Sequence, residues 1–152
     1  MSVKPFAISS FASWADMDAN AHMANVAYLS KCVDARMSFF KQHGFEVGEF
    51  ARRRIGPVVR RDEVEYFREV GLLEPVTVTL ELAGLAPDGS RFRLRNEILN
   101  GEGKVAARIT SEGGWLDLAK RKLIAPPADL LEALRAMPPA AEFESLPSSI
   151  RK

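Results

Sequence analysis

The sequence holds a single cysteine, Cys32, in 152 residues. One cysteine excludes an intrachain disulfide and any metal site built from several thiolates. An excess of one charge is also missing, because 21 lysines and arginines stand against 20 aspartates and glutamates, for a net charge of +1. Dedicated nucleic-acid binders usually carry a basic excess, so we expect no nucleic-acid partner.

Long hydrophobic runs are absent as well. No apolar run approaches the ~20 residues that a transmembrane helix needs, so no membrane partner is expected. The first eleven residues, with one lysine and no sustained apolar stretch, do not read as a signal peptide. The chain is 47% hydrophobic and 27% charged, which is the balance of a globular protein of about one domain. A cytoplasmic protein is the default expectation.

The hydrophobic pattern predicts one long helix. Apolar side chains recur at three- and four-residue steps at Val26, Leu29, Val33, Met37 and Phe40. This spacing gives the apolar stripe of an amphipathic helix. His43 and Gly44 mark its end, as a basic residue in the last turn and a glycine just beyond it.

Strands surround this helix in the sequence. Residues 4–14, rich in β-branched and aromatic side chains, predict a first strand. Alternation of apolar and polar side chains predicts four more, over residues 58–67, 76–82, 91–99 and 104–115. Tight turns at Pro87–Gly89 and Asn100–Gly101 demand antiparallel neighbours.

The C-terminal part is expected to be simpler. Residues 129–137 predict a short amphipathic helix, and the proline- and serine-rich remainder predicts a loosely held tail. One long helix facing one antiparallel sheet makes an α+β, two-layer domain.

The most informative stretch is Trp14–Tyr28, WADMDANAHMANVAY. Polar side chains occupy every second position from Asp16 to His22, directly before an apolar helix, and cost stability unless they are solvated or used. Two plain interpretations exist. Asn25 stands where the helix begins and can be a simple N-cap, and the whole segment can be a satisfied structural loop.

Metal binding fits this stretch poorly. D-x-D-x-N opens a calcium loop of the EF-hand type, but that loop needs Gly and Glu where this chain has Ala21 and Ala27. Zinc is disfavoured because His22 and His43 are distant in sequence and no thiolate partners exist. We therefore expect no metal and no cofactor.

The spacing D-x-D-x-N-x-H-x-x-N-x-x-Y before a long helix resembles the hot-dog-fold thioesterases that act on acyl-CoA or acyl-carrier-protein substrates, the 4-hydroxybenzoyl-CoA thioesterase-like superfamily. The resemblance covers about residues 4–118. It implies a single hot-dog domain over residues 1–152, in which the antiparallel sheet wraps around the central helix and a short helix and tail follow. It also implies hydrolysis of an acyl-CoA thioester.

By this resemblance Asp18 is the catalytic carboxylate, acting as general base or as nucleophile. Amides of the first helical turn, near Val26, would stabilise the oxyanion. Asn20 and His22 match positions that orient the carboxylate and water or line the site. A structural role through backbone bonds is favoured for Asp16.

Two further positions follow at the helix start. Asn25 stands where another branch of the family has histidine, so polarising the carbonyl and capping the helix both stay open. Tyr28 is expected to pack, with a backbone N–H that serves the substrate.

The resemblance also implies a homodimer or a dimer of dimers, because a protomer's active site is incomplete. Residues 56–67 are the expected contribution, with Arg60 and Glu63 as participants; an exposed sheet edge tends to be paired. The basic clusters Arg52–Arg54, Arg60–Arg61 and Lys120–Lys122 are either solvated faces balanced by acids or contacts to CoA phosphates.

Other residues have plainer interpretations. Met37, Phe39, Phe40 and Phe67 either line an acyl pocket or form ordinary core. Cys32 is expected to be a small buried hydrophobe and not a nucleophile.

Two other functions stay open. One is a non-catalytic acyl-thioester binding domain. The other is a hot-dog enoyl-CoA hydratase, whose D-x-N-P-x-H signature is not met because His22 follows Asp18 by four residues and Ala21 replaces the proline.

Overall fold

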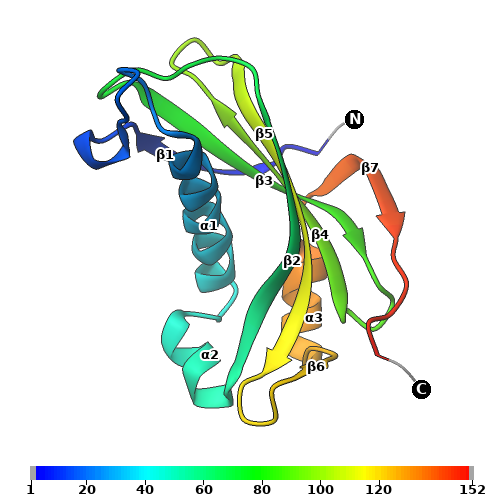
Figure 1. The fold of residues 1–152 in the computed structure, drawn as a ribbon. Helices are drawn as coiled ribbons and strands as arrows, with labels where there is room; N and C mark the ends of the chain where they lie inside the picture. Colours follow the sequence, from blue (N-terminus) through cyan, green and yellow to red (C-terminus); the bar gives the residue numbers. More distant parts are fainter. Residues whose placement is uncertain (1–2, 151–152) are drawn as a thin grey trace.

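The strands form one curved sheet in a computed structural model that describes residues 3–150 (Figure 1). The main strand order is β1 (Phe6–Phe11), β3 (Pro75–Leu85), β4 (Arg91–Leu99), β5 (Val105–Asp117) and β2 (Ile55–Tyr66). All four pairings are antiparallel. The short turns predicted the β3–β4 and β4–β5 pairs, whereas β2 pairs with β5 at the sheet edge and not with β3, the next strand along the chain. Two short strands join the sheet, with β6 (Lys122–Ile124) beside β5 and β7 (Pro139–Ser145) beside β3.

The helix α1 (Asn25–Gln42) lies against the concave face of this sheet (Figure 1). Two shorter helices, α2 (Val47–Arg53) and α3 (Ala128–Ala136), flank its far end. The predicted α+β arrangement, with one central helix and a short C-terminal helix, is confirmed. No helix within residues 3–150 is long and apolar enough to cross a membrane.

The predicted apolar stripe of α1 was wrong in part. Val26 and Val33 are 71% and 45% exposed. The buried face instead carries small, aromatic and two charged side chains: Ala27, Tyr28, Lys31, Cys32, Ala35, Arg36, Phe39 and Phe40. Lys31 and Arg36 are buried because polar partners lie beneath them, a circumstance that a hydrophobicity pattern does not register. The helix ends as predicted, with Gly44 at φ +88°.

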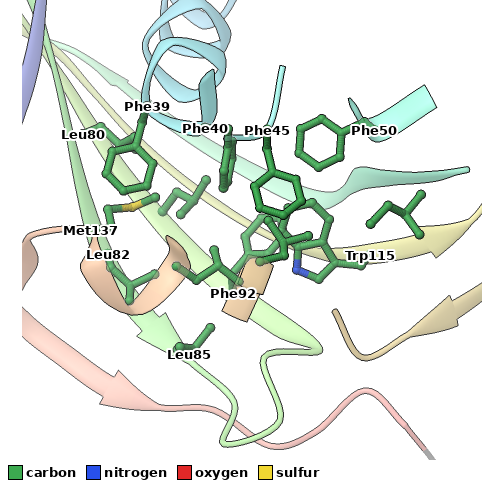
Figure 2. Packing of buried hydrophobic residues seen from close by; sticks show 14 residues of the cluster. Phe39, Phe40, Phe45, Phe50, Leu80, Leu82, Leu85, Phe92, Trp115 and Met137 are labelled. Atoms are coloured by element: carbon green, nitrogen blue, oxygen red, sulfur yellow. The ribbon is translucent and has the colours of Figure 1, made fainter. Parts of the chain in front are cut away.

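The end of the core away from the motif loop is aromatic (Figure 2). Trp115 of β5 stacks on Phe50 of α2 at 5.9 Å between ring centroids and meets Phe40 of α1 edge to face at 5.7 Å. Phe39, Phe45 and Phe92 extend this cluster, and α3 adds Leu130 and Leu134. We call this part of the core the aromatic end.

Beneath the motif loop the core consists of smaller side chains. Its members include Ala12, Ala27, Cys32, Ala35, Val76, Val78, Ala106 and Ala107. We call this part the small-residue end. A buried polar group lies on the inner face as well: Arg36 donates to the side-chain oxygen of Asn96 at 3.0 and 2.8 Å and to the Ser111 hydroxyl at 2.7 Å.

The C-terminal segment is held more firmly than its composition predicted. β7 pairs in parallel with β3, which corrects the expected loose tail. Beyond it, Leu146 is buried over Gly84 and its amide donates to the Leu85 carbonyl. The Ser149 amide donates to the Ser90 hydroxyl at 2.8 Å. Strand pairing, ion pairs from Arg93 to Glu144 and from Arg95 to Glu142, one buried leucine and a few hydroxyls together hold this segment despite its prolines.

Candidate active site

A short 3-10 helix, η1 (Trp14–Asp16), begins the motif loop. The Asp16 carboxylate accepts hydrogen bonds from the amide and hydroxyl of Ser13 at 2.8 and 2.9 Å and pairs with Lys31 of α1 at 2.8 Å. Burial alone raises the pKa of Asp16, but hydrogen bonds from Lys31 and Ser13 outweigh it and lower the pKa below its ordinary value. Asp16 therefore ties the loop to the helix, in line with the structural role favoured for it.

Asp18, Asn20 and His22 lie together in one tight turn. The Asp18 carboxylate accepts the Asn20 amide at 2.8 Å, and the Asp18 amide donates to the His22 carbonyl at 3.1 Å. Ala21 takes a left-handed conformation, with φ +63°, to close the turn. The Asp18 and His22 side chains are 29% and 31% exposed, and Nδ1 of His22 lies 3.7 Å from Oδ1 of Asp18.

His22 has its orientation set by the backbone. Its Nδ1 lies 3.0 Å from the Met23 carbonyl, which accepts only if Nδ1 carries the proton. In that tautomer Nε2 is an unprotonated acceptor. The loop itself is anchored, since the Met23 amide donates to the Val70 carbonyl and the Ala24 amide to the Asp16 carbonyl, both at 2.8 Å.

The opening turn of α1 differs from the simple capping interpretation. The N-cap is Ala24 and makes no side-chain cap, while Asn25 is already the first helical residue. The alternative of Asn25 as N-cap is therefore wrong, because the anchored loop backbone directs the chain into the helix without a side-chain cap. Within residues 3–150 the amides of Asn25 and Val26 have no acceptor, whereas the Ala27 amide donates to the Ala24 carbonyl. Such free amides at the positive end of a helix dipole suit a developing negative charge.

Two surface recesses flank this turn. One, of about 490 Å³, holds Asp18 among mostly apolar neighbours that include Trp14 and Leu72. The other, of about 320 Å³, is lined by His22, Asn25, Tyr28, Tyr66, Phe67 and three further residues. Asp18 and the helix start thus line different recesses, and the Asp18–His22 contact lies between them.

Tyr66 at the end of β2 lines the second recess, and the sequence analysis included it only within residues 56–67 without singling it out. Its hydroxyl donates to the Asn25 carbonyl at 3.0 Å. The predicted Tyr28 is buried, as expected of a packing residue, and its ring meets that of Tyr66 edge to face. No local signal joins positions 25 and 66, because the contact depends on the pairing of the whole sheet.

Arg60 and Glu63 lie apart from this loop. Arg60 approaches Glu112 at 3.9 Å, and Glu63 pairs with Arg61 at 2.9 Å, both on the outer face of the sheet. The inner face of β2 instead carries Asp62, which accepts from Ser111 beneath α1, and Tyr66. Alternation places Glu63 on the face opposite Asp62, and the bulge between Val59 and Arg61 turns Arg60 to the same outer face, so both lie away from α1 within one subunit.

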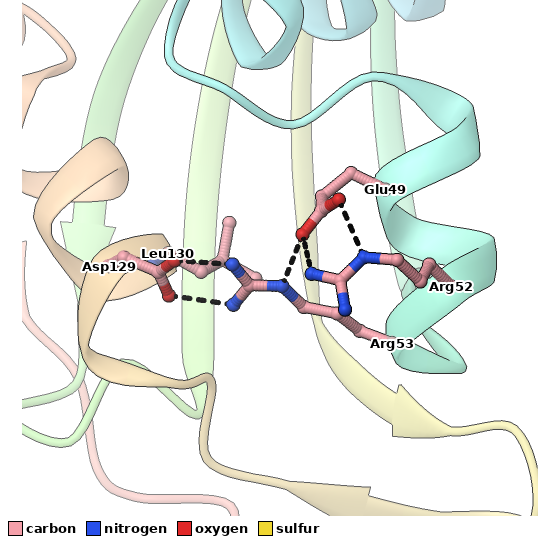
Figure 3. A network of polar contacts seen from close by, with 5 residues as sticks. All are labelled: Glu49, Arg52, Arg53, Asp129 and Leu130. Carbon is pink, nitrogen blue, oxygen red and sulfur yellow. Dashed lines mark hydrogen bonds and ion pairs between the residues drawn. The ribbon is translucent and has the colours of Figure 1, made fainter.

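Two arginines of the basic clusters form ion pairs with carboxylates of this chain (Figure 3). Arg53 forms a two-pronged contact with Asp129 of α3 at 2.9 and 2.5 Å and a third bond to Glu49 at 2.8 Å. Arg52 also binds Glu49. These contacts hold the pKa of Glu49 down at about 2. Arg52 and Arg53 are therefore balanced by acids of α2 and α3, while Lys120 and Arg121 lie in an exposed turn before Lys122 begins β6.

The remaining predicted residues are mostly core. Phe39 and Phe40 are buried in the aromatic end, whereas Phe67 is exposed and lines the second recess. Cys32 is fully buried, and burial raises the pKa of its thiol to about 12. At neutral pH it is therefore a thiol in an apolar setting, as predicted, and not a nucleophile.

Solved structures share this fold. A Staphylococcus aureus protein in complex with CoA has a TM-score of 0.78 and 19% identity, covering 93% of this chain and 90% of its own. A 1,4-dihydroxy-2-naphthoyl-CoA thioesterase from Synechocystis has a TM-score of 0.78 and 17% identity, with 88% and 97% covered. A DHNA-CoA thioesterase from Staphylococcus aureus has a TM-score of 0.78 and 20% identity, with 85% and 87% covered.

Comparison at the level of sequence gives the family. No curated protein sequence matches the chain. A sequence model of the thioesterase-like superfamily, however, matches residues 12–134, which span the motif loop, α1 and the strands β2 to β6 but not β1. The protein therefore belongs to the thioesterase-like superfamily, which confirms both the hot-dog resemblance and the thioester-hydrolase class predicted from the motif.

Proposed function

We propose that this protein hydrolyses an acyl-CoA thioester to a free acid and CoA, with Asp18 as the catalytic carboxylate. The observation that carries the proposal is an anchored Asp18–His22 turn followed directly in the chain by two free amides, those of Asn25 and Val26, at the start of α1. A thioester needs both a group that delivers water and donors that accept the charge growing on its oxygen.

Asp18 is suited to the first task. One carboxylate oxygen is held by the Asn20 amide, so the side chain is oriented and still partly exposed. As a general base it takes a proton from water while the water oxygen bonds to the carbonyl carbon. As a nucleophile it bonds to that carbon itself, and water then cleaves the mixed anhydride. Both routes need an ionised carboxylate, and the hydrogen bond from the Asn20 amide orients it, while the His22 ring lies beside it at 3.7 Å.

The amides of Asn25 and Val26 are suited to the second task. As the new bond forms, the carbonyl electrons move to oxygen, and these amides donate to the resulting oxyanion. Its collapse breaks the C–S bond, and in the general-base route the CoA sulfur takes up the proton that Asp18 carries. In the nucleophile route CoA leaves as a thiolate, which takes up the proton released when water cleaves the anhydride. One preorganised donor of this kind lowers the barrier by about 2.7–4 kcal/mol.

The experiment is a screen of acyl-CoA substrates of different length and aromaticity, with thiol release as the readout. Asp18→Asn is the decisive variant, because an asparagine oxygen can still accept the Asn20 amide but cannot take a proton or attack. We expect kcat to fall by about 10²–10⁴-fold, the usual contribution of a positioned acid–base group. Asp34→Asn, the same change on the exposed face of α1, is the matched control and should leave kcat unaltered.

Three outcomes would contradict the proposal. Full activity of Asp18→Asn removes Asp18 from the chemistry. Tight acyl-CoA binding without turnover at any chain length favours a binding domain. Loss of the enoyl absorbance of a 2-enoyl-CoA, without thiol release, favours a hydratase.

We also propose that the working form is a homodimer or dimer of dimers that pairs through β2. Within residues 3–150 this long strand has a partner, β5, on one side only. Val59, Tyr66 and Phe67 are large exposed hydrophobics on and just beyond it. Unpaired edges of this length are normally covered. Light scattering should give a mass of at least two subunits; a fully active monomer would contradict the pairing.

A further inference from the structure

The two tyrosines of the chain form a reciprocal clamp between α1 and the end of β2. The Tyr66 hydroxyl donates to the Asn25 carbonyl at 3.0 Å, and the Tyr28 hydroxyl donates to the Arg68 carbonyl at 3.4 Å. Their rings meet edge to face at 5.3 Å. Burial raises the pKa of both phenols, so at neutral pH each hydroxyl keeps its proton and can donate.

The bond from Tyr66 falls on a particular peptide unit. The Asn25 carbonyl and the Val26 amide belong to one planar group, with the carbonyl at one end and the N–H at the other. The carbonyl end accepts the Tyr66 hydroxyl, and the N–H end has no acceptor in the described chain. A hydrogen bond to the carbonyl fixes the plane and polarises it, which makes the N–H a stronger donor.

We propose that Tyr66 is a positioning residue that orients and polarises the Val26 amide for the thioester oxyanion. The inference rests on the proposed function, because it assigns Tyr66 to the same amide that the hydrolysis mechanism uses. Tyr66 acts through the peptide and does not need to touch the substrate. The Tyr28 hydroxyl bonds to a different peptide, that of Arg68, so the two phenols of one clamp have different consequences.

The test measures carbonyl polarisation directly. The acyl-CoA that the wild type hydrolyses fastest in the screen, labelled with ¹³C at its thioester carbonyl, is bound to Asp18→Asn, which does not consume it. Infrared difference spectra should show the carbonyl stretch at lower frequency than in free substrate. Adding Tyr66→Phe should reduce this shift, whereas adding Tyr28→Phe should retain it.

Kinetics give a second readout. With Asp18 intact, Tyr66→Phe should lower kcat about two- to eightfold, which corresponds to a 10–30% weakening of one oxyanion donor, and leave KM unchanged. A merely structural role would instead alter KM, or would alter kcat only together with thermal stability. Replacing Tyr66 with 3-fluorotyrosine, a stronger donor that keeps the ring, should increase the infrared shift and serves if Tyr66→Phe fails to fold.

Failure of the inference and failure of the proposed function are distinct. If the bound carbonyl shows no shift in Asp18→Asn, the helix amides do not hold the oxyanion and both ideas fall. If the shift is present and neither Tyr66 variant changes it, the oxyanion site stands and the role of Tyr66 is overturned.

Discussion

The two ends of the core contain side chains of different size. The end with large side chains contributes most to stability, and the end with small side chains lies beside the proposed reacting groups. The aromatic end packs six large rings from α1, α2, β4, β5 and the segment between the two helices, far from the motif loop. The small-residue end, under the loop, consists mostly of alanines, valines and Cys32, and its larger members are Met23, Tyr28, Ile98 and Ile109. Small side chains bury less apolar surface, so the reactive end gains less from hydrophobic burial.

Specific polar contacts hold the reactive end instead. The Asp16–Lys31 pair ties the loop to α1, and the Tyr28–Tyr66 clamp ties α1 to β2. Each fixes a backbone segment that the proposed chemistry uses. Packing at one end can therefore vary without moving the reacting groups, while the loss of a single polar contact at the other end would displace them.

The largest expected effect on stability comes from breaking the aromatic end. Trp115→Ala should lower the free energy of unfolding by about 3–5 kcal/mol, the usual cost of deleting a large buried ring. Trp115→Phe should cost less, since the indole N–H has no partner in the described structure and its removal orphans nothing. Urea denaturation measures both.

Activity distinguishes the two ends. At temperatures well below the melting temperature of the variant, Trp115→Ala should retain the kcat of the wild type. The reason is that the ring lies at the end of the core away from the motif loop. A parallel loss of kcat in the folded variant would show that the aromatic end takes part in positioning the site.

The sequence predicted the sheet better than it predicted the helix face. Alternation over residues 76–82 and 91–99 determines which side chains face α1 regardless of distant partners, so β3 and β4 appear where expected. The face of α1 could not be predicted in the same way. Lys31 can be buried because it pairs with Asp16 and donates to the Phe11 carbonyl. Arg36 can be buried because it donates to Asn96, 60 residues away, and to Ser111.

The candidate site shows the same division. Asp18, Asn20 and His22 lie close together in the sequence, and the structure joins them in one turn as the motif suggests. Tyr66 reaches Asn25 across 41 residues, and Arg60 and Glu63 face away because of the β2 register. A residue's side of a strand depends on its pairing, and a bulge between Val59 and Arg61 shifts that pairing.

The next effect in size comes from breaking the polar attachment of the reactive end. Asp16→Ala leaves the Lys31 ammonium, whose side chain is only 9% exposed, without its carboxylate. We expect a loss of about 3 kcal/mol in the free energy of unfolding, because an uncompensated buried charge remains. Asp16→Leu combined with Lys31→Met should recover much of that loss, and a cost below about 1 kcal/mol for Asp16→Ala would mean that water already solvates the lysine.

The smallest expected effect is the pH dependence of the stability that the Asp16–Lys31 pair contributes. The lowered pKa of Asp16 determines its direction. The pKa of Asp16 lies below its ordinary value of 3.8, so the folded state binds its proton less readily than the unfolded chain. Its contribution to stability is therefore complete above that ordinary value and is lost as pH falls through the lowered pKa. The difference in melting temperature between wild type and Asp16→Asn should shrink from pH 6 towards pH 2.

Glu49 and Asp129 at the other end also have lowered pKa values, but both proteins carry them, so their titration cancels in the difference. A difference that stays constant with pH would mean that the folded and unfolded chains bind the Asp16 proton equally well, which would contradict the lowered pKa.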